Sequence, residues 1–376
     1  MPLPPISIDA DIRAAHTLPA AFYRDAAYWE AAKAAIFAPA WQYIGGSASM
    51  PAPGHVQPLQ LLPGLLDEPL LLTHDGGALR CLSNVCTHRA NLVAGAAAPC
   101  HELRCRYHGR RFGLDGRFKS MPEFQDAADF PAESDHLPTV EMQRWGPLHF
   151  VALHPNIPFH DWLAPVRARL PWLPFDEFDP TPRDTQVYEI QAHWALYCDN
   201  YLEGFHIPFV HPGLNQVLSY PDYRYELFAG GSLQVGQAKT GDAVFDIPAG
   251  HPDHGKLIAA YYFWLFPNLM LNFYPWGLSL NHVEPVGPAQ CRVRFESYVW
   301  KPALYGPRNQ QVLHQTEMED EEVVESVQMG IRSRLYDRGR YSPKMEVAVH
   351  HFHRLIAAAL HASDLSTGDL FRGVER

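Results

Sequence analysis

The 376-residue chain has no excess of positive charge and no long uninterrupted apolar run. Its 30 Lys and Arg residues face 41 Asp and Glu residues, and the net charge of −11 argues against a nucleic-acid partner because nothing would offset phosphate repulsion. The most apolar stretch, residues 261–280, is interrupted by two prolines and two asparagines, so no membrane-spanning helix is expected. The N-terminus has no basic segment followed by an apolar one, which argues against a secretion signal. These absences predict a soluble cytoplasmic protein without a membrane partner.

Cysteine is also scarce, and the six that occur are unevenly spaced, unlike the framework of a disulfide-stabilised secreted domain. No Gly-x-Gly-x-x-Gly motif follows a predicted strand, so the chain is not expected to bind a flavin or nicotinamide dinucleotide itself. Histidine, in contrast, is abundant, with 21 residues, which fits metal chemistry. The length is sufficient for two domains with substantial cores.

Two short motifs combine cysteine with histidine. Cys86 and His88 form a Cys-x-His pair, and after sixteen intervening residues Cys105 and His108 form a Cys-x-x-His pair. Two thiolates and two imidazoles are the ligands of a Rieske [2Fe–2S] cluster. A Cys2His2 zinc site is the alternative, but zinc fingers usually pair Cys with Cys ahead of a helix, and a strand-turn pattern with Gly109 follows here. The spacing therefore predicts a [2Fe–2S] cluster bound by these two Cys and two His.

A second set of candidate ligands lies in a predicted helical stretch. Helical spacing places Asp199, Glu203 and His206 on one face, Pro208 is expected to end the helix, and His211 can turn back from the following loop. Two His and a carboxylate would form the triad that leaves positions open on Fe(II) for dioxygen and substrate. Taken by themselves, His206 and His211 could equally be structural histidines that bind no metal. A cluster that transfers electrons needs an acceptor, which favours a metal site here.

The missing carboxylate is expected from an acidic helix that begins near Asn309. Asp320 and Glu317 lie on its predicted inward face, whereas Glu319 and the acidic residues after Asp320 point more towards solvent. An inward carboxylate is costly unless it is paired or bound to metal. Asp320 is the preferred ligand and Glu317 the alternative. If the helix binds no metal, its acidic residues form an ordinary solvated face. The predicted apolar stripe of this helix consists of Leu313, Val324, Val327 and Ile331.

The order of predicted elements indicates an α+β fold. Residues 1–38 contain a helical segment expected to pack on the C-terminal domain. Residues 39–155 consist of short apolar runs between Gly and Pro turns and predict an all-β domain that holds both Cys/His motifs. Residues 156–376 begin with a Pro-rich connector with a short helix near 163–170. Strands and two long helices follow, the second over about 344–359, which predicts a helix-grip domain with an antiparallel sheet.

From about Trp41 to Leu360 this pattern resembles the catalytic α subunits of the Rieske non-haem iron oxygenases. The segments DNYLEGFHIPFVHPGL and ESVQMGIRSRLYDRGRYSPKMEVAVHHFH are most similar to the subgroup of choline, betaine and carnitine monooxygenases. The family motif carboxylate-x2-His-x4-His and its later Glu-Asp context are matched by Glu203, His206, His211 and Glu319-Asp320.

The resemblance implies a mononuclear Fe(II) in the C-terminal domain and a homotrimer in which the cluster of one subunit reduces the iron of its neighbour. Glu203 would act in catalysis by bridging His108 of a cluster to His206 across the interface. Electrons would come from NAD(P)H through a separate flavin and iron–sulfur reductase. Respiratory Rieske proteins carry a further Cys in each ligand region; Asn91 and Tyr107 stand in those places, which implies the oxygenase type of cluster with a lower potential.

The substrate class stays open between two oxygenase readings. One is oxidative N-demethylation or C–N cleavage of a betaine-like quaternary amine, and the other is hydroxylation or demethylation of an aromatic acid. A Rieske electron carrier or a zinc protein without oxygenase activity is the alternative of another class. Several aromatic side chains could either form a cage for a trimethylammonium group or simply belong to the hydrophobic core. They are Tyr197, Tyr201, Phe205, Trp264, Phe266, Phe273, Tyr274 and Trp276.

Overall fold

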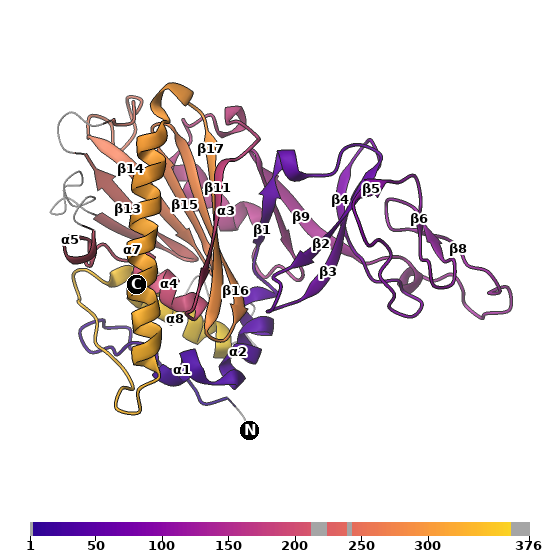
Figure 1. The fold of residues 1–376 in the computed structure, drawn as a ribbon, viewed down its shortest axis with the longest axis horizontal. Helices are drawn as coiled ribbons and strands as arrows, with labels where there is room; N and C mark the ends of the chain where they lie inside the picture. The colour runs from indigo at the N-terminus through magenta and orange to yellow at the C-terminus, as the bar shows by residue number, and fades with distance from the viewer. Residues whose placement is uncertain (1–2, 212–223, 239–242, 362–376) are drawn as a thin grey trace.

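The protein has an elongated shape in which a β-rich unit projects from a larger unit of sheet and helices (Figure 1). The computed structural model describes residues 3–211, 224–238 and 243–361. The predicted α+β class and the order of the two units along the chain are confirmed. Among the described residues, no helix is both long and apolar enough to cross a bilayer.

The β-rich unit is built on a seven-stranded antiparallel sheet with the order β1-β10-β9-β4-β3-β2-β5. The turn between β3 and β4 has the expected chemistry, because the Asp75 carboxylate accepts hydrogen bonds of 2.8 Å from the N–H groups of Gly77 and Ala78. A small sheet, β6-β7-β8, holds the second Cys/His motif between its first two strands. The strands of this unit are β1 (Gln42–Gly46), β2 (His55–Leu61), β3 (Glu68–His74), β4 (Leu79–Ser83), β5 (Ala98–Pro99), β6 (Leu103–Arg104), β7 (Arg111–Phe112), β8 (Phe118–Ser120), β9 (Thr139–Trp145) and β10 (Leu148–Ala152).

The larger unit contains a second seven-stranded sheet with the order β11-β17-β16-β15-β14-β13-β12. Neighbouring strands are antiparallel throughout, and from β12 to β17 they follow one another along the chain as a meander. The strands are β11 (Arg183–Ile190), β12 (Arg224–Phe228), β13 (Gly231–Gln237), β14 (Ile258–Leu265), β15 (Leu269–Tyr274), β16 (Gly277–Gly287) and β17 (Gln290–Val299). The predicted start of β12 at Tyr223 lies outside the described residues.

The long helix α7 (Pro307–Ile331) runs across this sheet, and α4 (Trp194–Tyr201) lies between the two (Figure 1). The helix α8 (Val347–His361) contacts β12 and β13. The other helices are α1 (Ala20–Arg24), α2 (Ala26–Ala32), the π-helix η1 (Lys33–Phe37), α3 (Phe159–Arg169), α5 (Ile207–Val210) and the 3-10 turns η2 (Ser47–Ser49), η3 (Glu133–Asp135), η4 (Phe175–Glu177) and η6 (Pro302–Leu304).

The N-terminal helices pack on the larger unit and share its core. Phe37 lies edge-on to Trp194 at 5.0 Å between ring centroids, and Trp194 and Trp264 both contact Phe352 of α8. All four rings are buried. The chain ends also meet, since the N–H of Ile6 donates to His361 Nε2 at 2.8 Å. The helix layer therefore combines segments from the start, middle and end of the chain.

One predicted helix is in fact two. The stretch expected to continue to Pro208 breaks after Tyr201, because the Glu203 carboxylate accepts hydrogen bonds from the N–H groups of Phe205 and His206 and turns the chain there. Pro208 lies in the first turn of α5, where its missing N–H costs nothing, instead of ending a helix. Asp199 lies in α4, before the break, and its Oδ1 pairs with His353 Nε2 at 2.8 Å.

The predicted inward stripe of α7 is partly wrong. Val324 and Ile331 are buried, as expected, but Val327 is 43 % exposed. Gln328 takes the inward place, and its Oε1 accepts a hydrogen bond of 2.7 Å from the N–H of His193. With 3.6 residues per helical turn, the residue four positions after Val324 lies about 40° from it around the axis, and the residue three positions after it lies about 60° away. Gln328 therefore shares the buried face of Val324 more closely than Val327 does.

We expect Phe352→Ala to lower the free energy of unfolding by about 3–5 kcal/mol, because it removes a fully buried ring between Trp194 and Trp264. Urea unfolding followed by circular dichroism measures the change. The control is Leu335→Ala, whose side chain is 99 % exposed and whose effect should stay within about 0.5 kcal/mol. Equal stability of the two variants would contradict the packing described above.

Candidate metal centres

The two Cys/His motifs lie on two loops with the same backbone frame. In the first, the N–H of Cys86 donates to the Asn91 carbonyl at 2.9 Å, and the N–H of Ala90 donates to the Cys86 carbonyl at 3.0 Å. In the second, the corresponding bonds join Cys105 to Arg110 at 2.8 Å and Gly109 to Cys105 at 3.0 Å. Gly109 has a φ of +74°, which glycine adopts without strain. Each loop is thus a closed turn that presents one thiol and one imidazole.

The four predicted cluster ligands converge at the end of the β-rich unit. The rings of His88 and His108 lie 4.7 Å apart, and both thiols are buried. His108 Nδ1 is buried without a hydrogen-bond partner, as a nitrogen that awaits a metal would be. Burial opposes ionisation, but the N–H groups of Tyr107 and His108 and the Asn91 amide lower the pKa of Cys105. Strands β7 and β8, not a helix, follow the second motif. The donor set fits a [2Fe–2S] cluster.

The second predicted site brings His206, His211 and Asp320 together, with one possible ligand atom of each within 4.8 Å of the others. His206 Nε2 lies 3.4 Å and His211 Nε2 3.0 Å from Asp320 Oδ1. The two His flank the four-residue helix α5, and Asp320 lies in the middle of α7. Because α5 is only one turn long, the imidazoles at its two ends both lie next to Asp320 of α7.

Negative charge at this point favours a cation. Burial lowers the pKa of His206, but hydrogen bonds to Asp320 and Glu203 outweigh it and raise the pKa to about 9. Burial raises the pKa of Asp320, yet its two histidine partners bring it below its usual range. The carboxylates that hold protons on these imidazoles would attract a metal ion when the imidazoles are neutral. The set fits Fe(II), which takes two His and one carboxylate and keeps open positions.

Each histidine is oriented by a carboxylate on its far nitrogen. Glu203 Oε1 lies 2.7 Å from His206 Nδ1, and Glu319 Oε2 lies 2.7 Å from His211 Nδ1. Both imidazoles thereby turn Nε2 towards Asp320. Such partners fix the tautomer and strengthen the ligand. Glu319 was expected to point more towards solvent than Asp320, and its side chain is indeed 28 % exposed against 14 %, but its contact with His211 was not predicted. Its other oxygen accepts a hydrogen bond of 2.9 Å from Gln315 Nε2. Only its position next to Asp320 could have indicated this role.

Glu317, the alternative third iron ligand, does not belong to the group formed by His206, His211 and Asp320. It is 4 % exposed, and its Oε2 accepts a hydrogen bond of 2.7 Å from the Tyr197 hydroxyl. Burial raises the pKa of Glu317 well above its usual range. Glu317 thus belongs to the packing between α7 and α4.

The aromatic residues considered as a pocket wall are divided between two cores. Trp264 and Phe266 belong to the core under α8, whereas Phe273 packs with Phe175 at the junction with the β-rich unit. Phe205 is 42 % exposed beside His206. The set does not form a single cage.

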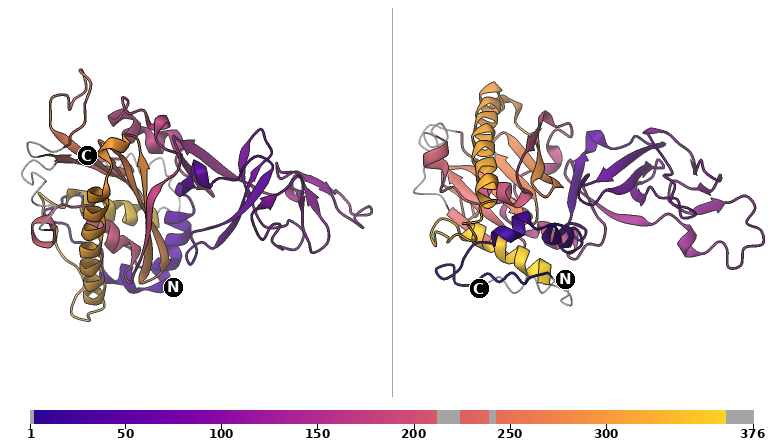
Figure 2. Two further views of the ribbon diagram at one scale, coloured as in Figure 1. Left: turned by 45° about the horizontal axis from the view of Figure 1, so that its top comes forward. Right: turned by 60° about the horizontal axis from the view of Figure 1, so that its bottom comes forward.

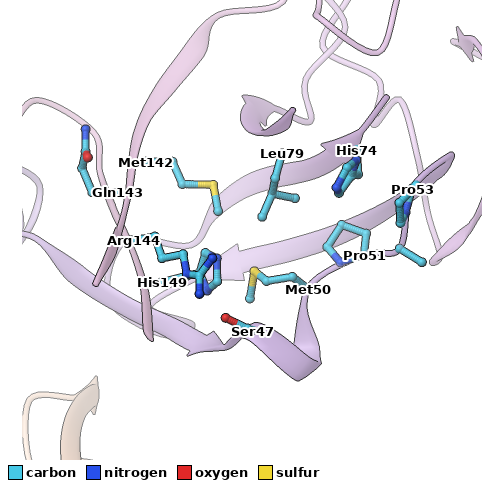
Figure 3. Close-up of a pocket in the computed structure, with 11 residues that line it drawn as sticks. Ser47, Met50, Pro51, Pro53, His74, Leu79, Met142, Gln143, Arg144 and His149 are labelled. Atoms are coloured by element: carbon cyan, nitrogen blue, oxygen red, sulfur yellow. The ribbon is translucent and has the colours of Figure 1, made fainter. Parts of the chain in front are cut away.

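A cavity of about 480 Å³ lies in the β-rich unit, away from both metal centres (Figure 3). Met50, Met142 and Arg144 are among its lining residues, and none of the predicted ligands lines it. It is therefore no candidate for the reaction site.

Comparisons with known families agree with these two centres. Residues 40–131 match the Rieske [2Fe-2S] domain, and residues 178–362 match the ring hydroxylating alpha subunit (catalytic domain). The chain is a Rieske non-haem iron oxygenase α subunit. The predicted family and cofactor types are confirmed.

This Rieske oxygenase is similar over most of its length to curated relatives. It is 28 % identical to choline monooxygenase from Arabidopsis thaliana, over 91 % of this chain and 82 % of the relative. It is 26 % identical to the carnitine monooxygenase oxygenase subunit of Escherichia coli K12, over 94 % of this chain and 96 % of the relative.

Solved structures share the fold of this oxygenase. A quaternary ammonium Rieske monooxygenase in complex with L-carnitine superposes with a TM-score of 0.73 at 21 % identity, covering 95 % of this chain and 99 % of the other. Naphthalene 1,2-dioxygenase from Rhodococcus sp. gives a TM-score of 0.70 at 18 % identity, covering 93 % and 95 %.

We expect Glu319→Gln to weaken iron binding at the second centre by about 10–100-fold, because an amide orients His211 without supporting its basicity. Titration of the iron-depleted second site with Fe(II), followed by metal analysis, measures the affinity. Glu322→Gln is the matched control, since Glu322 is exposed on the same helix. Equal affinities in the two variants would refute the role of Glu319.

Proposed function

We propose that this oxygenase α subunit hydroxylates a methyl or methylene group of a betaine-like quaternary amine. The observation that carries the proposal is the convergence of His206, His211 and Asp320 in a chain that also carries a Rieske domain. The similarity to choline and carnitine monooxygenases supports the substrate class. A reaction that consumes dioxygen, two electrons and two protons would turn a C–H bond into C–OH and release one water.

His206, His211 and Asp320 would hold the mononuclear iron, and Cys86, His88, Cys105 and His108 the cluster. Iron with three protein ligands supplies dioxygen activation when it is bound. The chain's own contribution is to fix the imidazoles: Glu203 and Glu319 hold their Nδ1 sides and keep both Nε2 atoms on Asp320. His211 is almost fully buried, which limits the access of water.

A second copy of the chain would complete the electron path. Within one chain, the ligand loops beside β6 lie at one end of the long axis, and α5 with its two His lies at the other (Figures 1 and 2). A head-to-tail homotrimer would bring the cluster of one subunit to the iron site of the next. Glu203, with its side chain 14 % exposed, would then join a cluster imidazole such as His108 of the neighbour to His206 by hydrogen bonds.

Electrons would reach the cluster from NAD(P)H through a separate reductase, since the sequence has no dinucleotide-binding motif. Hydroxylation of an N-methyl group gives a carbinolamine, which releases formaldehyde; hydroxylation of the carbon next to nitrogen in the longer arm leads to C–N cleavage. Ring hydroxylation of an aromatic acid is the second candidate, supported by the fold shared with naphthalene dioxygenase.

We expect substrate-dependent oxygen uptake with methylated amines when an iron–sulfur flavoprotein reductase and NADH are supplied. A panel of choline, glycine betaine, carnitine and benzoate-type acids distinguishes the candidates, and formaldehyde or trimethylamine identifies the bond that breaks. Uptake with aromatic acids alone would refute the amine proposal, and uptake with none would refute both oxygenase readings.

With Fe(II) supplied at a saturating concentration, we expect Glu203→Gln to hold both metals but to lose most of the oxygen uptake. Gln has a single acceptor oxygen, and when that oxygen holds the backbone turn, its NH2 donor faces the imidazole N–H groups in place of Oε1. Gln still accepts from the N–H groups of Phe205 and His206, so the turn should persist. Rapid-mixing measurement of cluster reoxidation by the iron site tests this. Reoxidation at the wild-type rate would rule out a bridging role.

A further inference from the structure

The two cluster-ligand loops are joined at one residue, Asp135. Thr87 lies between Cys86 and His88 in the first loop, and its Oγ1 donates a hydrogen bond of 2.9 Å to the Asp135 carbonyl. Arg110, two residues after the second loop's histidine, donates from Nη2 to the same carbonyl at 3.0 Å and to the Asp135 carboxylate at 2.5 Å. We call Thr87, Arg110 and Asp135 the loop brace.

The guanidinium of the loop brace is buried and fixed. Arg110 is 2 % exposed, and its Cζ lies 5.0 Å, 5.5 Å and 5.7 Å from the ring centroids of Phe118, Phe130 and Phe112. Among the described residues, Asp135 is its only carboxylate partner, and that carboxylate is also held by the N–H of Ala132 at 2.7 Å. The charge cannot move away from the cluster loops.

Stability alone does not account for a buried guanidinium in this place. The Arg110 side chain is 2 % and the Asp135 side chain 18 % exposed, and the removal of a charge from water often costs as much as the ion pair returns. The position of the cation suggests a different effect. The Arg110 carbonyl accepts a hydrogen bond from the N–H of Cys105, and its guanidinium shares the Asp135 carbonyl with Thr87, the residue between Cys86 and His88. Its charge therefore lies beside both ligand loops.

We propose that the loop brace holds the two ligand loops together and that the buried Arg110 cation raises the reduction potential of the [2Fe–2S] cluster. Reduction adds one negative charge to the cluster, and a fixed cation nearby stabilises that charge, whereas the Asp135 carboxylate opposes it. The inference rests on the proposed cluster ligands but not on the iron site or the substrate.

A second contact crosses between the same loops. The Asn91 amide, at a position where respiratory Rieske proteins carry a bridging cysteine, lies 3.5 Å from Cys105 Sγ with Nδ2 as donor. The two loops are thus joined by a direct hydrogen bond as well as through the Asp135 carbonyl.

The test is the midpoint potential of the cluster in the intact purified protein, measured by a spectroscopic redox titration. Arg110→Met keeps the length and removes the charge, and we expect at least a tenfold lower ratio of reduced to oxidised cluster at a fixed potential, about 59 mV downwards for one electron. Asp135→Asn keeps the acceptor and removes the opposing charge, and the potential should rise. Arg111→Met is the matched control, because Arg111 is exposed and pairs with Glu102 at the surface; it should change nothing.

Opposite signs for the two charge variants are the decisive outcome. Shifts in the same direction, or no shift with an intact rhombic signal of the reduced cluster, would overturn the electrostatic role. If Arg110→Met takes up no cluster, Arg110→Lys should retain a potential close to that of the wild type. A potential of Arg110→Lys that is lowered by about 59 mV, as expected for loss of the charge, would overturn the proposal.

Thr87→Val tests the brace separately. We expect this variant to lose the cluster faster at an unchanged potential, and unchanged cluster retention would refute the role of the brace. Oxygen uptake enters none of these measurements, so failure of the proposed function stays distinguishable.

Discussion

A carboxylate that faces two imidazoles is the interaction on which the arrangement of the larger unit depends. Asp320 lies within 3.4 Å of both histidines, so their positive charge or a metal ion must balance it. To bring the three side chains together, the chain breaks after α4, turns on the Glu203 carboxylate and forms only one turn of helix before His211. The position of the long helix α7 along its own axis is also fixed, because Asp320 near its middle must lie opposite the two histidines.

Sequence patterns predicted local features well and contacts between distant segments poorly. The Cys/His motifs and the pair His206 and His211 could be recognised because each motif lies on one short loop and the pair flanks a single helical turn, where spacing nearly determines geometry. The partners of these residues could not be found in the same way. Glu319 meets His211 across 108 positions, and neither Thr87 nor Arg110 has a sequence feature that points to Asp135.

The break after Tyr201 illustrates a further limit. Helical periodicity continued through this stretch, but a carboxylate that accepts from the backbone two and three positions ahead offered the chain a competing turn. Helix propensity cannot anticipate this, because the same Glu203 side chain could face solvent in a continuous helix. The hydrogen bonds of Glu203 to two backbone N–H groups and to His206 Nδ1 stabilise the turn over the continuous helix.

The packing of the N-terminal helices against α8 has a consequence for synthesis. The strands of the β-rich sheet all lie within residues 42–152 and can pair early, although Tyr43 and Phe150 pack in a core that includes residues of the larger unit. The core of the larger unit includes Phe37 near the start and Phe352 near the end. Apolar surface on the first helices therefore stays uncovered until translation is almost complete. During that interval the nascent chain would depend on chaperones, and truncated products would expose this surface to aggregation.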